Sequence, residues 1–239
     1  LAYASDLATD AMAALGIEAS ADNLTQFGDE MAMASSKANY SVAQLGEAIL
    51  TVGGTAKNLA GGTVELNTAL GVLANRGIKG AEGGTALRNM ILSLSAPTDK
   101  AAATLKSLGV SAFDAEGNLN PLNETFKKLD NVMQSMSQEQ KTNVLNNIFN
   151  KVDLKSAEAM LAGCGAVFDN LSASIASSSG AMQDMADVQM DNLKGQMTIL
   201  GSGLEGLGIQ VYEKFETPMK EAAETAITSV DEVARNLRS

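Results

Sequence analysis

Residues 201–206 read Gly-Ser-Gly-Leu-Glu-Gly, the GxGxxG spacing with which dinucleotide-binding folds hold a pyrophosphate. Glu221 and Glu224 follow about twenty residues later, where those folds place an acid for the ribose hydroxyl. The fingerprint requires a strand before its first glycine, whereas an apolar heptad runs through it here, and residues 207–239 are too few for the remaining strand–helix units. The glycines are better explained as small residues on a helix face that another helix approaches. A nucleotide-binding enzyme stays a remote alternative.

Two other patterns resemble ligand loops. Residues 77–85 are glycine-rich, like a loop that cradles phosphate, but they lack the Gly-Lys-Ser/Thr ending that binds phosphate and Mg²⁺. Asp114, Glu116 and Asn118 alternate as at the start of a calcium loop, yet Leu119 stands where glycine is required. We expect a turn between helices at the first and no tight calcium site at the second.

The chain contains no histidine and one cysteine, Cys164. Without histidine, the commonest general base and metal ligand is missing, and a carboxylate-pair glycosidase is the enzyme class that stays open. Cys164 lies among small residues, which favours a buried packing role over a nucleophile. We therefore predict no catalytic residue, no cofactor-binding residue and no metal ligand.

Composition limits the partners. Twenty-eight acidic against seventeen basic residues give a net charge of −11, which disfavours binding to free nucleic acid or to an anionic membrane. No apolar stretch reaches the roughly 18 residues of a membrane-spanning helix. The chain begins at Leu1 with no visible signal peptide, and we expect it to be a piece of a longer protein.

The elements that carry these residues are predicted to be helices. Aromatic residues make up only 4% of the chain, and apolar residues recur at three- and four-residue spacings. This pattern predicts a mainly α fold, a multi-helix bundle with one small β-hairpin near residues 110–120, followed by long heptad-patterned helices. The hairpin is expected because apolar residues alternate there around an Asp/Gly/Asn-rich turn.

Helix starts and breaks are marked by capping residues and glycines. Asp22 or Asn23 is expected to cap a helix, and another is expected to begin at Ser41 and to kink or break at Gly53 and Gly54. A further helix is expected to follow Gly83 and Gly84, and others to be capped by Thr98 or Asp99 and by Ser137, with Gln140 completing a capping box.

The serine-rich run at residues 176–180 is the best candidate for a linker. It divides the chain into a compact helical core region with the small hairpin, residues 1–176, and a long helical, coiled-coil-like segment, residues 177–239. Apolar residues of the second segment keep four–three spacing. The candidate helix-interaction face consists of Leu193, Met197, Leu200, Gly203, Leu204, Leu207 and Val211.

Three stretches in the middle of the chain resemble one protein family. They are Gly-Ala-Glu-Gly-Gly-Thr-Ala-Leu-Arg-Asn-Met at 80–90, Leu-Lys-Ser-Leu-Gly-Val at 105–110, and Phe-Asp-Ala-Glu-Gly-Asn-Leu-Asn-Pro-Leu at 113–122. As a set they resemble the core region of phage tail tape-measure proteins. Residues 179–182 and 191–200 are similar to the closing portion of that family, so the resemblance spans nearly the whole chain.

The resemblance implies a structural protein that fills the tail tube, sets tube length by its own extent and leaves ahead of the DNA. It implies tail tube and tail assembly chaperone proteins as partners, and the virion tail, assembled in the bacterial cytoplasm, as location. We also expect self-association through heptad faces, and neither nucleic-acid nor membrane binding by this segment. A helical interaction or signalling bundle without catalytic role is the alternative.

Length gives a physical scale for that role. A continuous helix of 239 residues would extend about 360 Å at 1.5 Å per residue. Short capped helices and turns, however, predict that residues up to about 176 fold compactly in isolation. We therefore expect the free and the assembled conformations to differ.

Overall fold

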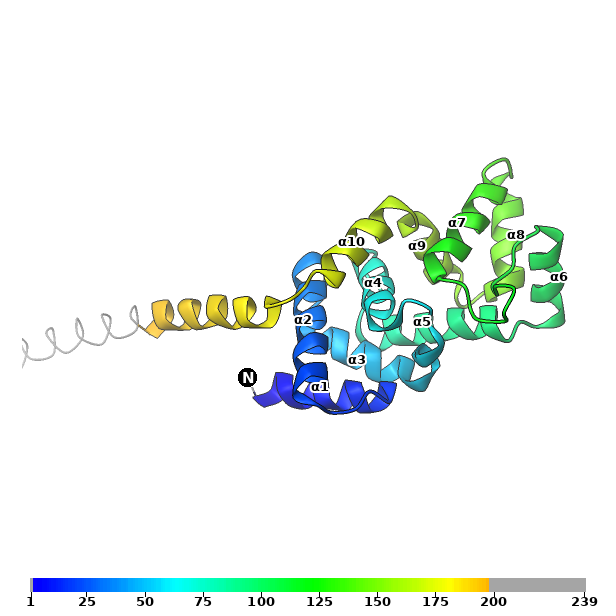
Figure 1. Cartoon of the computed structure of the whole chain (residues 1–239). Coiled ribbons are helices and arrows are strands. Elements are labelled where there is room, and N and C mark those ends of the chain that lie inside the picture. The colour runs from blue at the N-terminus through cyan, green and yellow to red at the C-terminus, as the bar shows by residue number, and fades with distance from the viewer. Residues whose placement is uncertain (1, 198–239) are drawn as a thin grey trace, which may run out of the picture. The chain divides into compact units, whose positions relative to one another are not determined.

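The computed structural model describes residues 2–197, and the chain divides into two units, residues 1–186 and residues 187–239. Helices dominate the described part (Figure 1), which confirms the predicted mainly α fold. Unit 1 contains α1 (Ala2–Leu15), α2 (Ala21–Lys37), α3 (Val42–Val52), the 3₁₀ helix η1 (Gly53–Asn58), α4 (Gly62–Asn75), α5 (Gly80–Ser95), α6 (Asp99–Ser107), α7 (Leu122–Met133), α8 (Gln138–Phe149), α9 (Leu154–Gly163) and α10 (Ala166–Ala176). Residues 181–197 are helical as well.

Helix α4 lies in the middle of unit 1, against α2, α5, α9 and α10 (Figure 1). All of its residues from Glu65 to Ala74 are buried, including the polar side chains of Glu65, Asn67 and Thr68. Because polar side chains are buried along with the leucines, α4 has no clear solvent-facing side. Its buried polar groups consequently need partners on other helices.

Local caps set several helix starts as predicted. Ser41 and Gln44 form a capping box for α3, and Ser137 and Gln140 form one for α8. Helix α3 ends where Gly53 adopts a φ of +56°, and the chain continues as η1, which confirms the predicted break.

Two predicted starts are wrong. The cap of α2 is Ser20, whose hydroxyl accepts the amide of Asn23 at 3.2 Å, rather than Asp22 or Asn23. Helix α5 begins at Gly80 and contains Gly83 and Gly84 instead of following them. Its glycines are needed for packing, because a Cβ on Gly84 would overlap the Ala48 carbonyl oxygen of α3.

The predicted β-hairpin near residues 110–120 is also wrong. The described residues contain no strand, and this stretch has only an isolated antiparallel bridge between Phe113 and Leu119. The carboxylate of Asp114 accepts the backbone amide of Asn118 at 2.7 Å and its side-chain amide at 3.1 Å. Two backbone hydrogen bonds, from Asp114 to the Asn118 carbonyl and from Asn120 to the Ala112 carbonyl, also cross the turn. The loop is therefore closed by these few backbone contacts and by the Asp114 side chain, without extended strands.

Helices α6, α7 and α8 form the end of unit 1 away from α1 and α2 (Figure 1). There the rings of Phe126 and Phe149 stack with their centroids 5.5 Å apart, and both side chains are fully buried. Leu122, Leu129 and Met133 of α7 are buried with them, at the heptad-like spacing of the sequence. This cluster is continuous with the core around α4.

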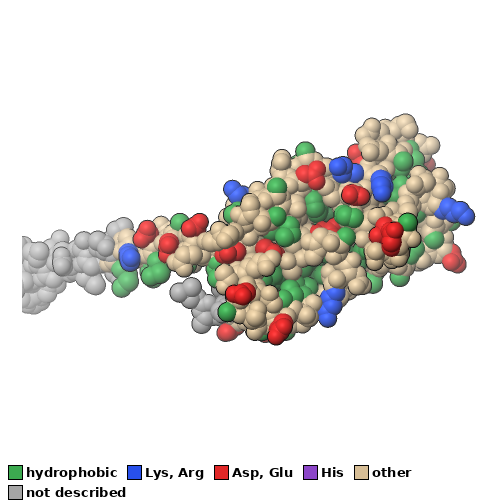
Figure 2. Space-filling model, in the orientation of Figure 1, with side chains coloured by type: hydrophobic (Ala, Val, Ile, Leu, Met, Phe, Trp, Pro, Cys, Tyr) green, Lys and Arg blue, Asp and Glu red, His purple; other side chains and the backbone are tan. Residues whose placement is uncertain are grey.

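The surface of unit 1 is mixed. Figure 2 shows acidic, basic and hydrophobic side chains interspersed on the visible face of the core helices. Leu50, Leu92 and Val152 are among the exposed large hydrophobic residues. Of the helices that the structure describes, none alone is long and apolar enough to cross a membrane; α9 and α10 reach that length only together, and they are bent by 78°.

Candidate functional site

The predicted helix-interaction face is only partly within the described residues. Leu193 and Met197 lie in the helical stretch 181–197 and are 57% and 64% exposed. Leu200, Gly203, Leu204, Leu207 and Val211 lie outside the described residues, as do the GxGxxG glycines and the long heptad-patterned helices beyond residue 197. Met190, three residues before Leu193, is also exposed. The described part therefore presents three apolar side chains at three- and four-residue spacing.

The start of this helical stretch is held by a residue that sequence reasoning missed. The carboxylate of Asp29, on α2, accepts the backbone amides of Gly180 at 2.8 Å and of Met182 at 2.9 Å. Asp29 is only 5% exposed. Backbone amides at a helix start have no partner within the helix. A carboxylate there accepts their hydrogen bonds, and its negative charge is favourable at the positive end of the helix dipole.

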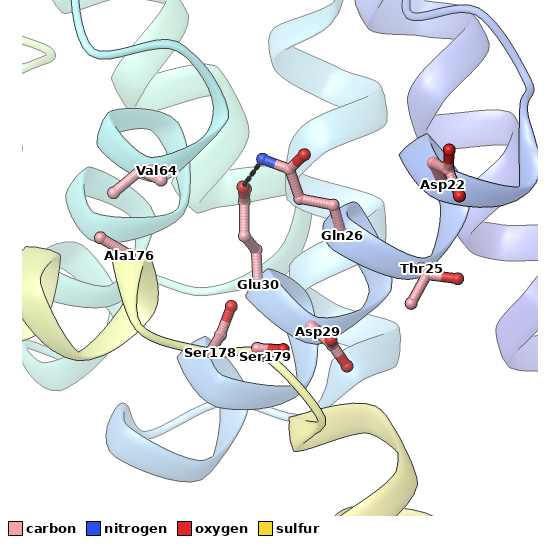
Figure 3. A pocket seen from close by; sticks show the side chains of 9 residues that line it. All are labelled: Asp22, Thr25, Gln26, Asp29, Glu30, Val64, Ala176, Ser178 and Ser179. Atoms are coloured by element: carbon pink, nitrogen blue, oxygen red, sulfur yellow. Dashed lines mark hydrogen bonds between the residues drawn. The ribbon is translucent and has the colours of Figure 1, made fainter.

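A polar cleft of about 440 Å³ lies beside this contact. Figure 3 shows its lining, with Asp29 and Glu30 on α2, the Glu30 carboxylate pointing toward Gln26, and Ser178 and Ser179 on the segment after α10. The remaining lining residues are Asp22, Thr25, Gln26, Val64 and Ala176. The cleft thus carries three carboxylates and no basic side chain, and among the described residues no group of three or more acidic, cysteine or histidine side chains is arranged to hold a metal.

Glu30 connects the cleft to the buried face of α4. Its carboxylate accepts the side-chain amides of Gln26 at 3.3 Å and of Asn67 at 3.4 Å. Burial raises the pKa of Glu30, and these hydrogen bonds, with one from Thr63, oppose the shift. The hydrogen bond from Asn67 makes Glu30 a contact between α2 and α4.

Glu65 makes a similar connection between α4 and α7. Its carboxylate accepts the amide of Gly61 at 2.8 Å and that of Leu122, in the first turn of α7, at 2.5 Å. Pro121, at the N-cap of α7, makes no side-chain cap. Burial raises the pKa of Glu65, while the two backbone hydrogen bonds lower it. Glu65 therefore supplies the cap that the α7 sequence lacks.

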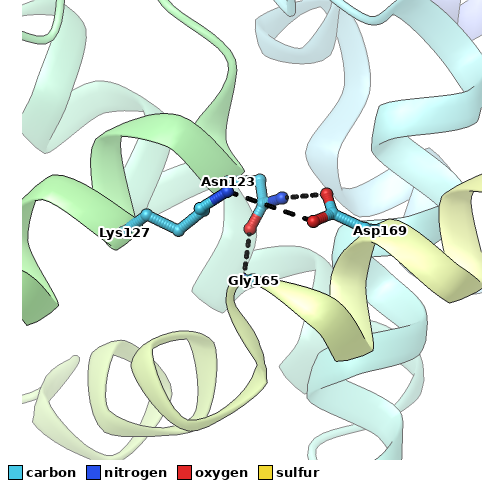
Figure 4. Close-up of polar contacts among 4 residues, drawn as sticks. All are labelled: Asn123, Lys127, Gly165 and Asp169. Atoms are coloured by element: carbon cyan, nitrogen blue, oxygen red, sulfur yellow. Dashed lines mark hydrogen bonds and ion pairs between the residues drawn. The ribbon is translucent and has the colours of Figure 1, made fainter.

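A third cluster joins α7 to α10 (Figure 4). The Asn123 side chain accepts the Gly165 amide at 2.8 Å and donates to Asp169 at 2.6 Å, and Lys127 lies 4.0 Å from Asp169. Gly165 occupies the N-cap of α10 and has no side chain to cap it. Asn123 is buried, whereas the Lys127–Asp169 ion pair is half exposed and contributes little.

The residues that the sequence analysis considered for ligand binding or catalysis lie in helix starts, loops and the edge of the core. Residues 76–79 connect α4 to α5, and the rest of the glycine-rich stretch, from Gly80 onward, belongs to α5. Asp114 uses its carboxylate to close its own loop, which lowers its pKa. Cys164 is partly buried against the core, and burial, followed by the charge of Asp130, raises the pKa of its thiol. A raised pKa favours the thiol over the nucleophilic thiolate.

Comparison with known proteins gives a consistent result. The family model described as "Phage-related minor tail protein" matches residues 1–150. The chain is 27% identical over 237 residues to a "Tape measure protein" of Pneumococcus phage Dp-1, covering 99% of this chain and 20% of that protein. It is 28% identical over 210 residues to a "Probable tape measure protein" of Escherichia phage P2, covering 86% of this chain and 26% of that protein.

The chain thus spans between a fifth and about a quarter of the length of these curated relatives. No solved structure matches it.

Proposed function

Because this chain belongs to the phage-related minor tail protein family, we propose that it is a structural segment of a tape-measure protein that sets the length of the tail tube and acts without catalysis. The observation that carries the proposal is the similarity of 99% of the chain to one tape-measure protein and of 86% to a second. We propose that the segment is assembled into the virion tail in the bacterial cytoplasm. Its proposed partners are tail tube and tail assembly chaperone proteins.

The helical architecture supports this role through its capacity to change length. In the compact form, many short helices fold back on one another, joined by turns such as those at Gly77 and Gly109. An α-helix rises 1.5 Å per residue, so the same chain drawn out as one helix would extend about 360 Å. We propose that the segment contributes its length in an extended helical state.

Tail length tests the proposal directly. In-frame removal of residues 1–239 from the parent gene should shorten the tails by up to about 360 Å, measured by electron microscopy. Replacing the segment with an unrelated heptad-patterned sequence of equal length is the matched control and should restore normal tails. Normal tails after the deletion would refute the ruler role, and absent tails would assign the segment to initiation of assembly instead.

The exposed apolar residues support self-association of this segment. Met190, Leu193 and Met197 have the spacing of a helix seam and are all about half or more exposed. The full chain should therefore have a light-scattering mass above that of one copy. Leu193→Asp combined with Met197→Asp should return it to a single copy, because two charges would be buried without partners.

A matched control uses the same helix. Asn192→Asp adds a charge at an exposed position outside the four–three pattern and should leave the mass unchanged. A wild-type chain that is monomeric over the accessible concentration range would refute self-association through this face.

A further inference from the structure

The joint between α10 and the following helical stretch is ordered by contacts with α2. Ser178 is only 5% exposed, and Gly180 adopts a φ of +85°. Met182 packs against Gly28, because a Cβ built on Gly28 would lie 2.7 Å from the Met182 sulfur. Within the serine-rich run, Ser178 is therefore buried, and Gly180 is hydrogen-bonded to α2.

One side chain accepts two of the hydrogen bonds at this joint. Gly180 precedes the helical residues 181–197 and has no side chain with which to cap them. Asp29 supplies both acceptors, for the amides of Gly180 and Met182, from more than 150 positions away in the chain. The start of this helix consequently depends on α2 as well as on local backbone hydrogen bonds, such as that from Ala181 to the Ser178 carbonyl.

We propose that Asp29 is a latch that fixes the helix start at residue 181 and couples it to the folded state of unit 1. When α2 moves away, Gly180 and Met182 lose their acceptors, and the first turn frays. The next side chain able to cap is that of Asp184, one turn later. Release of the latch therefore moves the helix start from residue 181 to residue 185 and frees the segment that joins it to α10.

The charges around the latch make it releasable. Asp29 shares the cleft with Asp22 and Glu30, and no Lys or Arg lines the cleft (Figure 3). The Asp29 carboxylate is thus held by amide groups alone while two other carboxylates lie nearby. Like charges in one cleft repel each other, and this repulsion weakens, without abolishing, the binding of the Asp29 carboxylate to the two amides.

Hydrogen exchange of individual amides in the full chain tests the latch. In Asp29→Ala, exchange at Gly180, Met182 and Gln183 should become about tenfold faster, the effect of losing a charge-assisted cap, while α4 amides keep their protection. Asp29→Asn keeps one acceptor oxygen and should show a smaller increase. Asp22→Asn, in the same cleft, is the matched control and should change nothing at these amides.

A second pair of variants tests the shifted start. Asp184→Ala alone should have little effect, whereas Asp29→Ala combined with Asp184→Ala should also expose the amides of residues 185–187. Unchanged exchange at Gly180 and Met182 in an intact Asp29→Ala chain would overturn the latch. Loss of protection throughout α4 in both Asp29 variants would also overturn it, because Asp29 would then be a general stability residue.

Discussion

The carboxylate of Glu65, on the central helix α4, accepts the backbone amide of Leu122 at the start of α7, 57 residues later in the chain. The same carboxylate accepts the amide of Gly61, which precedes α4. One buried side chain therefore completes the starts of two helices. This relationship ties the helices around α4 to the cluster of α6, α7 and α8.

Glu65→Ala should destabilise the chain strongly. The change leaves the buried amide of Leu122 and the part-buried hydrogen-bonding site of Gly61 without their acceptor, and a buried unsatisfied group costs about 1–3 kcal/mol. We expect a loss of about 2–4 kcal/mol in the free energy of unfolding, measured by urea denaturation. Glu158→Ala, at an exposed position on α9, is the control and should change stability by less than about 0.5 kcal/mol.

Glu65 should also make stability depend on pH in the direction opposite to acid denaturation. Burial raises its pKa in the folded state above the ordinary value of 4.5, so the folded chain binds this proton more tightly than the unfolded chain. Its contribution is fully present below the unfolded pKa and is lost as pH rises through the raised pKa. Glu65→Gln cannot titrate, so wild type should lose stability relative to this variant as pH rises from below 4.5 through the raised pKa of Glu65. A constant difference over that range would contradict the raised pKa.

Gly84→Ala should separate α3 from α5. The added Cβ would overlap the Ala48 carbonyl oxygen, which belongs to backbone and cannot rotate away. Overpacking of this kind costs about 1–3 kcal/mol, and we expect a lower urea midpoint with an unchanged slope. In Gly54→Ala the added Cβ meets only the end of the Lys57 side chain at 3.9 Å, so this variant should keep the wild-type midpoint.

A substitution at Asn123 should destabilise the chain less when Asp169 is changed with it. Asn123→Asp keeps an acceptor for the Gly165 amide but places a second carboxylate against Asp169, and should cost about 2 kcal/mol. Adding Asp169→Asn restores a donor and an acceptor at that contact and should recover about half or more of the loss. The double-mutant cycle measures this coupling, and additive effects of the two changes would contradict the direct hydrogen bond.

Local signals predicted much of the fold. The caps at Ser41, Thr98 and Ser137 and the break at Gly53 depend on residues within one turn of the chain, and the structure confirms each of them. The hairpin prediction failed for a local reason too. Alternating apolar residues were present, but backbone pairing stops at the bridge between Phe113 and Leu119, and the Asp114 side chain accepts amides inside the turn.

The cross-helix contacts could not be predicted in the same way. Asp29, Glu65 and Asn123 bind amides that are 151, 57 and 42 residues away, and no spacing in the sequence indicates such partners. One weak signal existed for Glu65, which is the single charged residue of α4. The helix starts gave a second weak signal. Pro121, Gly165 and Gly180 have no side chain that can cap a helix, so the cap must come from a residue elsewhere in the chain.

These long-range caps set the smallest part of the chain that can be moved as a module. The family match ends at residue 150, but Asn123 and Asp29 lie within it while the amides they bind, at Gly165 and Gly180, lie beyond it. A recombination event that joined foreign sequence after residue 150 would leave both acceptors buried and empty. Exchange between related genes should therefore be better tolerated at joints after residue 182, which keep Asn123 and Asp29 with the amides of Gly165, Gly180 and Met182.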